Sequence, residues 1–318
     1  MDSIREIKKD LPLVKHLPGP RKIRRIVVEW CKERRKERRM YHRPKQYADY
    51  LFKLSFGHGI DWRHPRDLNE WINYLAFKTD TSEWSRLADK YEVRNFVAER
   101  GLSHILLPLY GKWENPSDIA FDELPNSFAI KTNCSCGDTI IVTDKLKADI
   151  ESIRQKMQVA LDTRDDLFIQ SAEPHYLRIR QLVVCEKLVP STFTTDYKVW
   201  CFGGQPFGIL TCSNRDKEMH RLDLAMYDLC WNRHDEWMTE SYKNDVEVAK
   251  PIHLEEMIEY ARILSKGFPE VRVDFYDTPE SVYFGEMTFT SCCGRMAYFT
   301  PELLKIMGAK VGDAFLKE

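Results

Sequence analysis

Two short apolar segments near the C-terminus carry charged side chains in their interiors, and they constrain the fold more than any other part of the chain. Segments 270–276 and 281–289 are separated by the turn sequence DTPE, so we expect two neighbouring strands. Strand alternation places Arg272, Asp274 and Tyr276 on one face of the first segment, and Glu286 and Thr288 on one face of the second. Charged groups in strands this apolar are costly unless they are paired or bind a metal ion.

The acidic residues of these two segments predict a magnesium site. Mg²⁺ binds through one or two carboxylates together with the phosphates of a substrate, and an Asp and a Glu on neighbouring strands suit that arrangement. We therefore expect Asp274 and Glu286 to hold Mg²⁺ beside Arg272. A buried ion pair between the arginine and the carboxylates, with no metal, is the alternative.

Segment 128–142 predicts an anion-binding loop. It consists of a strand that ends at Lys131, a short loop of small polar residues and a second strand. Small side chains allow backbone N–H groups to close on an anion, and the lysine adds a positive charge nearby. An ordinary hairpin with a lysine at its edge is the alternative.

Two further strand-like segments place charged residues where a nucleotide could be contacted. Segment 183–189 runs from an apolar strand into Glu186 and Lys187, which offer an acceptor and a donor for the edge of a purine. In the next strand-like segment, Asp196 and Lys198 share one face. A strand end that reaches solvent and a cross-strand ion pair are the respective alternatives.

Composition and standard motifs exclude several protein classes. The 318 residues suffice for about two domains, and the longest apolar runs, about five residues, are far below the roughly 20 that a spanning helix needs. No signal-peptide h-region is visible, and nine cysteines, an odd number, favour reduced thiols in the cytoplasm. The motifs of P-loop NTPases, Rossmann dehydrogenases, zincins and α/β-hydrolases are missing.

The amino-terminal region contains a strongly basic segment, although the formal net charge of the whole chain is only −1. Residues 21–46 hold twelve Lys and Arg against three Glu, and the apolar residues between 23 and 31 follow a helical period. We expect a solvated terminal helix; adsorption of this helix to an anionic surface at the inner face of the membrane is the alternative. Nucleic-acid binding is disfavoured because few aromatic residues are interleaved with the charges.

Helical and strand-like periods mix along the rest of the chain without strict alternation, which favours an α+β fold over a doubly wound sheet. Helices are expected at 67–78, at 82–99, from Leu146 through Leu161, and at 254–266. Strands are expected at 182–189, 196–202, 206–213, 270–276 and 281–289, and short β-rich runs lie between about 104 and 144.

The charged segments, taken in order, resemble the ATP-grasp superfamily. Arg272-Val273-Asp274 followed by Glu286-Met287-Thr288 is similar to its metal-binding pattern R-V-D…E-x-N, with Thr in place of the usual Asn. Cys185-Glu186-Lys187-Leu188 resembles the hinge that holds adenine, and Leu87-Ala88-Asp89-Lys90-Tyr91 followed by Arg94 resembles the stretch that supplies the first phosphate-binding cation. Longer stretches between about 66 and 308, including LPNSFAIKTN and YFGEMTFT, narrow the resemblance to the TupA-like ATP-grasp family.

This resemblance implies an ATP-grasp fold, in which two α+β subdomains grip a nucleotide. The implied parts are a basic helical extension at 1–50, a helical region at 51–110, an N-terminal subdomain at 111–185, and a C-terminal subdomain with the metal site at 186–318.

The resemblance also implies roles for individual residues. ATP would be bound by Lys90, Arg94, Lys131, Ser135, Gly137, Glu186, Lys187, Leu188, Asp196 and Lys198. Mg²⁺ would be bound by Asp274, Glu286 and Thr288. The catalytic residues would be Arg272, Lys198, Arg215 and Arg295, of which the three arginines would contact the acceptor carboxylate or its acyl phosphate.

Two loops depart from the family pattern because each carries a cysteine pair. Cys134-Ser135-Cys136-Gly137 replaces an H-G-S-G sequence, and Ser291-Cys292-Cys293-Gly294 replaces a turn of the Pro-Gly-Ser type. We expect these cysteines to act as small residues beside glycine. A four-cysteine zinc site and redox control of the loop are the alternatives.

The implied activity is the ATP-dependent ligation of a carboxylate to an amine through an acyl phosphate, with ATP and Mg²⁺ as cofactors. The family context implies that an amino acid is joined to a sugar acid or glycan precursor in cell-surface polysaccharide biosynthesis. An ATP-grasp kinase that phosphorylates a hydroxyl and a non-catalytic protein of the membrane surface are the alternatives. Neither the two substrates nor an oligomeric state follows from the sequence.

Overall fold

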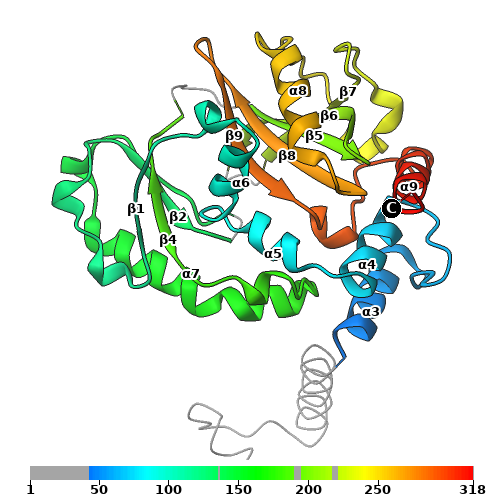
Figure 1. Cartoon of the computed structure of the whole chain (residues 1–318), viewed down its shortest axis with the longest axis horizontal. Coiled ribbons are helices and arrows are strands. Elements are labelled where there is room, and N and C mark those ends of the chain that lie inside the picture. The colour runs from blue at the N-terminus through cyan, green and yellow to red at the C-terminus, as the bar shows by residue number, and fades with distance from the viewer. Residues whose placement is uncertain (1–42, 135–136, 190–194, 217–220, 318) are drawn as a thin grey trace, which may run out of the picture.

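The computed structural model describes residues 43–134, 137–189, 195–216 and 221–317 (Figure 1). Most of the predicted basic helix lies outside the described residues, so its adsorption to a membrane stays a prediction. Within the described ranges, no helix combines the length and the apolar composition that crossing a bilayer requires.

Two antiparallel sheets with helices on their faces form the fold, which confirms the predicted α+β class. The first sheet has the strand order β1-β4-β2-β3. Its strands are β1 (Leu109–Trp113), β2 (Phe128–Thr132), β3 (Ile140–Val142) and β4 (Val183–Glu186). Helix α7 (Ile150–Ser171) packs against this sheet, because its buried Ile153 and Met157 meet Phe128 and Ile130 of β2 in one apolar cluster.

The second sheet has the strand order β7-β6-β5-β8-β9. Its strands are β5 (Asp196–Phe202), β6 (Gln205–Asp216), β7 (Arg221–Tyr227), β8 (Glu270–Asp277) and β9 (Val282–Thr288). Helix α8 (Leu254–Ser265) lies against β5, β6 and β8. The Cys201 thiol on β5 reaches the Ala261 carbonyl oxygen of α8 at 3.8 Å, so helix and sheet approach closely there.

Helices from both ends of the chain complete the core of the second sheet. They are α4 (Leu68–Lys78), α5 (Ser82–Ala88), α6 (Val93–Glu99) and α9 (Pro301–Phe315). Helix α3 (Pro44–Phe56) lies outside this core, and its buried Tyr47 and Ala48 pack with Ala172 just after α7. Helices α4 and α9 pack on each other, and Leu68 and Met307 share one cluster with Val199 of β5. Helices α4, α5 and α6, which precede the first sheet in sequence, therefore pack with the second sheet in space (Figure 1).

Single turns of 3₁₀-helix join these elements. They are η1 (Ser103–Ile105), η2 (Pro116–Asp118), η3 (Phe121–Glu123), η4 (Lys145–Lys147), η5 (Tyr176–Arg178), η6 (Asp235–Trp237), η7 (Glu240–Tyr242) and η8 (Ser291–Gly294). Along the chain, the first sheet ends at Glu186 and the second begins at Asp196, so residues 187–195 connect the two sheets. The domain bounds themselves stay a prediction.

The structure corrects two of the expected helices. The helix expected at 82–99 is two helices, because the Asp89 carboxylate accepts a hydrogen bond from the Tyr91 N–H at 2.8 Å and starts a new turn. The long amphipathic helix begins at Ile150 rather than at Leu146, since Asp149 caps it and Leu146 is 89% exposed. Helices α3 and α9 and strand β7 were not expected.

Gly308 tests the packing of α4 against α9. A Cβ atom at this position would lie 2.6 Å from the backbone carbonyl carbon of Asp67, which a side-chain rotation cannot relieve. We expect Gly308→Ala to destabilise the protein by about 1–3 kcal/mol, although alanine in a helix interior ordinarily stabilises by up to ~1 kcal/mol. Urea denaturation measures the change. Ile306→Ala, at a half-exposed position of the same helix, is the control, and a stabilised Gly308→Ala protein would contradict the packing.

Candidate active site

Three charged side chains form one row across the second sheet. Lys198 of β5 is the register partner of Asp274 of β8, and Asp274 is the register partner of Glu286 of β9. Directly opposite residues of antiparallel strands point to the same face, so the three side chains are neighbours. Gly285 lies at a bulge beside this row, where a Cβ atom would come within 3.0 Å of the Asp274 carbonyl oxygen.

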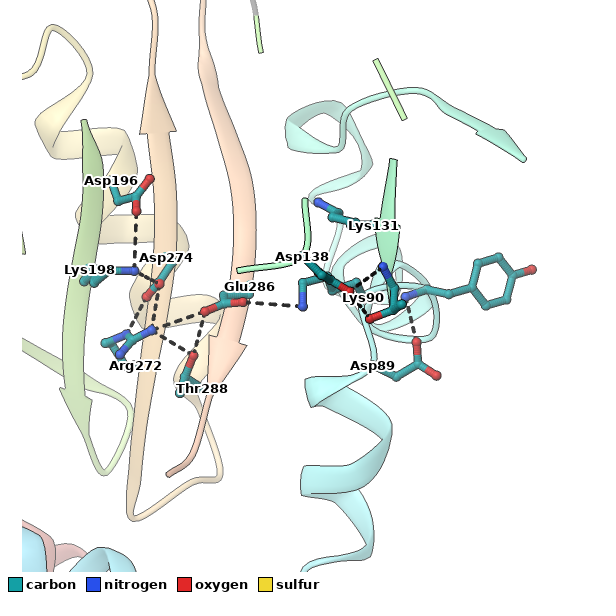
Figure 2. Close-up of polar contacts among 12 residues, drawn as sticks. Asp89, Lys90, Lys131, Asp138, Asp196, Lys198, Arg272, Asp274, Glu286 and Thr288 are labelled. Carbon is teal, nitrogen blue, oxygen red and sulfur yellow. Dashed lines mark hydrogen bonds and ion pairs between the residues drawn. The ribbon is translucent and has the colours of Figure 1, made fainter. Parts of the chain in front are cut away.

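The Arg272 guanidinium holds this row together (Figure 2). Its Nε and Nη2 atoms donate to the two carboxylate oxygens of Asp274 at 2.7 and 2.8 Å. Nη2 also donates to Glu286 Oε1 at 3.3 Å and to Thr288 Oγ1 at 3.0 Å, and Nη1 donates to Ser291 Oγ at 3.0 Å. One buried cation therefore orients both acidic side chains and the hydroxyl group beside them.

Ion pairing keeps these groups charged although burial opposes charge. Burial lowers the pKa of Lys198 and of Arg272, but the acidic groups around them, Asp274 first among these, together outweigh burial and leave both pKa values raised. Burial likewise works against an ionised Glu286, yet Lys90, Lys198 and Arg272 lower its pKa to about 2. At neutral pH Glu286 is therefore ionised, and Lys198 and Arg272 are protonated.

A second group of charges lies on the first sheet. Lys131 of β2 pairs with Glu186 at the end of β4, and Arg94 Nη1 lies 4.0 Å from Glu186 Oε2. The Lys187 N–H donates to the Pro108 carbonyl oxygen at 2.9 Å, while its side chain is exposed and that of Leu188 is half-buried. The residues predicted to hold adenine thus sit directly beside a predicted phosphate ligand.

Lys90 joins the two groups. Its ammonium nitrogen is 3.9 Å from Glu286 Oε2, and Figure 2 shows its side chain directed from the α5–α6 turn toward the second sheet. The turn is held because the Lys90 N–H donates to the Asn133 carbonyl oxygen at 2.7 Å. Asn133 in turn bonds the backbone of Arg180 and Leu182, so the turn is anchored to the segment that enters β4.

The loop after Lys131 is only partly described. Ser135 and Cys136 lie outside the described residues, whereas Gly137 is exposed and has a positive φ of 85°. Asp138 accepts hydrogen bonds from the backbone N–H and the hydroxyl of Thr132, which fixes the far end of the loop. The Cys134 thiol is buried and lies 3.7 Å from Arg164 Nη1, so it faces the first sheet's helix rather than a ligand.

Of the remaining predicted site residues, Asp196 lies in the row, whereas no contact of Arg215 or Arg295 with the row is described. Lys198 Nζ lies 3.9 Å from Asp196 Oδ2, so Asp196 extends the row at the start of β5. The backbone of Arg215 lies near the end of β6, and its side chain is outside the described part. Arg295 Nη1 donates to the carbonyl oxygens of Ser171 and Cys293, at 3.3 and 3.5 Å. The carboxylate-binding roles of both arginines stay predictions.

The donor set at the row fits Mg²⁺. Asp274 and Glu286 offer oxygen ligands for the metal. The Thr288 hydroxyl donates to Glu286 Oε1 at 3.2 Å, so it orients this carboxylate and could itself be a further oxygen ligand. No group of three or more His, Cys, Asp or Glu side chains able to hold a metal was found among the described residues. Two carboxylates leave coordination positions for substrate phosphates. Because Cys136 is not described, the four-cysteine zinc alternative stays untested.

Sequence reasoning missed several residues that shape this site. Asn133 and Asp138 flank the lysine loop, and the sequence K-T-N with an aspartate five residues later was a usable signal. Ser291 and Glu173 carried no such signal, because each acts through contacts with residues far away in the chain.

Comparisons with known proteins place the chain in a family. The family model described as TupA-like ATPgrasp matches residues 70–312. Among solved structures, D-alanine–D-alanine ligase from Bacillus anthracis complexed with ATP aligns at 16% identity over 73% of this chain and 65% of that one, with a TM-score of 0.41. L-amino acid ligase from Bacillus licheniformis aligns at 10% identity over 78% and 55%, with a TM-score of 0.45.

N5-carboxyaminoimidazole synthetase from Staphylococcus aureus, complexed with ADP, aligns at 13% identity over 68% of this chain and 50% of that one, with a TM-score of 0.42. The chain therefore spans between half and two thirds of the length of these three proteins. No curated protein matches the sequence. Because the family model covers most of the chain, the protein belongs to the TupA-like ATP-grasp family and has the ATP-grasp fold.

Proposed function

We propose that this protein is an ATP-dependent carboxylate–amine ligase that joins an amino acid to a sugar acid or a glycan precursor. One observation carries the proposal: the row Lys198–Asp274–Glu286 on the second sheet faces Lys131 of the first, and Lys90, on the turn that bonds Asn133, reaches Glu286 (Figure 2). Phosphates and Mg²⁺ need this combination of cations and carboxylates.

Each charged group has a role in this proposal. Lys90, Lys131 and Lys198 would contact the phosphates of ATP, and the segment from Glu186 to Leu188 would hold adenosine. Asp274 and Glu286 would hold Mg²⁺, which neutralises charge on the phosphates when bound.

The proposed cations are already paired in the structure. Lys131 pairs with Glu186 and Lys198 pairs with Asp274, and the side chains of all four are at most one-sixth exposed. These partners hold each ammonium group in place before a nucleotide arrives, so little side-chain entropy is lost on binding. Catalysis would then consist of positioning and charge neutralisation in a partly buried site.

The proposed reaction has two steps. A carboxylate oxygen of the acceptor attacks the γ-phosphorus of ATP, the bond to the β–γ bridging oxygen breaks, and ADP leaves. The amine nitrogen then attacks the acyl carbon of the acyl phosphate, the carbon–oxygen bond breaks, and inorganic phosphate leaves while the nitrogen loses a proton. The described site shows no side chain placed to carry a covalent phosphoryl or acyl group, and the scheme needs none.

Product analysis tests the reaction. Sugar acids such as glucuronate and galacturonate are incubated with ATP, Mg²⁺ and hydroxylamine, which traps acyl phosphates as hydroxamates. We expect ADP and a hydroxamate from at least one sugar acid, because hydroxylamine replaces the amine. AMP with pyrophosphate would indicate an adenylating enzyme, and a stable phosphate ester would favour the kinase alternative.

Glu286 tests the metal site with little risk to the fold. Its side chain is 38% exposed, whereas Asp274 is buried against two cations that its neutralisation would leave uncompensated. We expect Glu286→Gln to lower turnover on the order of 100-fold at saturating ATP, and Thr288→Ala to have a smaller effect. Glu280→Gln, at an exposed position in the turn of the same hairpin, is the control. Wild-type turnover by Glu286→Gln would contradict the metal assignment.

A further inference from the structure

A buried carboxylate outside the row of charges connects the two halves of the molecule. Glu173 follows the end of α7 and is only 8% exposed. The Thr290 hydroxyl donates to its Oε1 atom, and the Cys293 thiol donates to its Oε2 atom at 3.3 Å. Burial raises the pKa of Glu173, and these donors act against the increase. Burying a carboxyl group costs free energy, so its presence at this position indicates that its contacts have a function.

The turn that Glu173 contacts has an unfavourable backbone. Cys292 and Cys293 have φ values of 47° and 56°, and Gly294 follows at 60°, so three successive residues are left-handed. Such a conformation persists in non-glycine residues only where surrounding contacts impose it. On the α4 side, Asn73 donates to the Gly294 carbonyl oxygen at 3.1 Å. On the α7 side, Glu173 holds the turn.

Ser291 connects this turn to the charged row. Ser291 follows Thr290 directly, and its hydroxyl accepts the hydrogen bond from Arg272 Nη1 at 3.0 Å. Arg272 in turn orients Asp274 and Glu286. Contacts therefore run without interruption from Glu173 through residues 290 and 291 to the guanidinium.

Helix α7 connects these contacts to the first sheet. Its first half is packed on the first sheet, and its C-terminal end lies toward α4 and the loop after β9 (Figure 1). A second contact supports this approach, since Arg295 donates to the Ser171 carbonyl oxygen at the last turn of α7. The position of the first sheet is thereby tied to the hairpin that carries the carboxylates.

We propose that Glu173 is a positioning residue of the metal site: it fixes Thr290 and Cys293 so that Ser291 holds Arg272, and Arg272 holds Asp274 and Glu286. This role rests on the proposed function, because it assumes that the two carboxylates bind Mg²⁺ with a nucleotide. Residues that orient metal ligands from outside the ligand set commonly set metal affinity.

The test measures binding of a non-hydrolysable ATP analogue, AMP-PNP, by calorimetry with Mg²⁺ and with EDTA. We expect Glu173→Ala to lower the Mg²⁺-dependent gain in affinity roughly tenfold and to leave affinity in EDTA unchanged. Glu173→Gln should restore most of the gain, since its amide oxygen still accepts from Thr290. Equal weakening in both buffers would show a general structural role and overturn the proposal, as would an unchanged gain.

The two neighbouring cysteines provide a matched pair of variants. Cys293→Ala removes a donor to Glu173 and should reduce the Mg²⁺-dependent gain. Cys292→Ala should not, because the Cys292 thiol lies 3.9 Å from the Tyr298 hydroxyl and makes no described contact with Glu173. Both positions have positive φ, so the backbone cost of the two substitutions is alike. Equal effects of the two variants would contradict the proposal.

Hydrogen exchange without nucleotide separates this proposal from the proposed function. Glu173→Ala should accelerate amide exchange in β9 and the turn after it, at 284–294, and leave α8 protected as in the wild-type protein. If the wild-type protein binds no AMP-PNP, the proposed function is wrong, and exchange alone decides whether Glu173 supports the hairpin. If Glu173→Ala fails to fold, Thr290→Val and Cys293→Ala replace it in both measurements, with the same outcomes for and against.

Discussion

The guanidinium of Arg272 is the interaction on which the site depends. Asp274 and Glu286 are register partners on adjacent strands, and two carboxylates this close repel each other unless a cation lies between them. Arg272 contacts both and also Thr288 and Ser291, so its fork of donors sets the geometry of four neighbours. In a buried setting these bonds are strong, and loss of one partner would leave a charge uncompensated, at a cost of roughly 3–5 kcal/mol.

The surrounding fold explains how two sheets present their charges toward each other. Helices α4, α5 and α6 belong to the core of the second sheet, and the Lys90 turn between α5 and α6 bonds Asn133, directly after β2 of the first. Helix α7 packs on the first sheet, and Glu173, just after its end, contacts the segment after β9. Residues of each half therefore bond the other half, and the ion pair between Lys90 and Glu286 lies between these contacts.

Much of the site could be predicted because its residues lie on strands whose alternation is visible in sequence. Period-two patterns placed Lys198, Asp274 and Glu286 each on a face of its own strand, and the register of the sheet shows that the three are neighbours. Helix α9 was missed because Gly308 lowers helix propensity, yet that glycine permits contact with the backbone of α4. Glu173 was missed because its partner Thr290 is 117 residues away, a distance that no local pattern encodes.

The location of a bound nucleotide tests the central claim most directly. A crystal structure with AMP-PNP and Mg²⁺ should place the phosphates against Lys131 and Lys198, and the adenine beside the segment from Glu186 to Leu188. The metal should be coordinated by Asp274 and Glu286. A nucleotide bound away from the facing charges of the two sheets, or a metal that contacts neither carboxylate, would contradict the account.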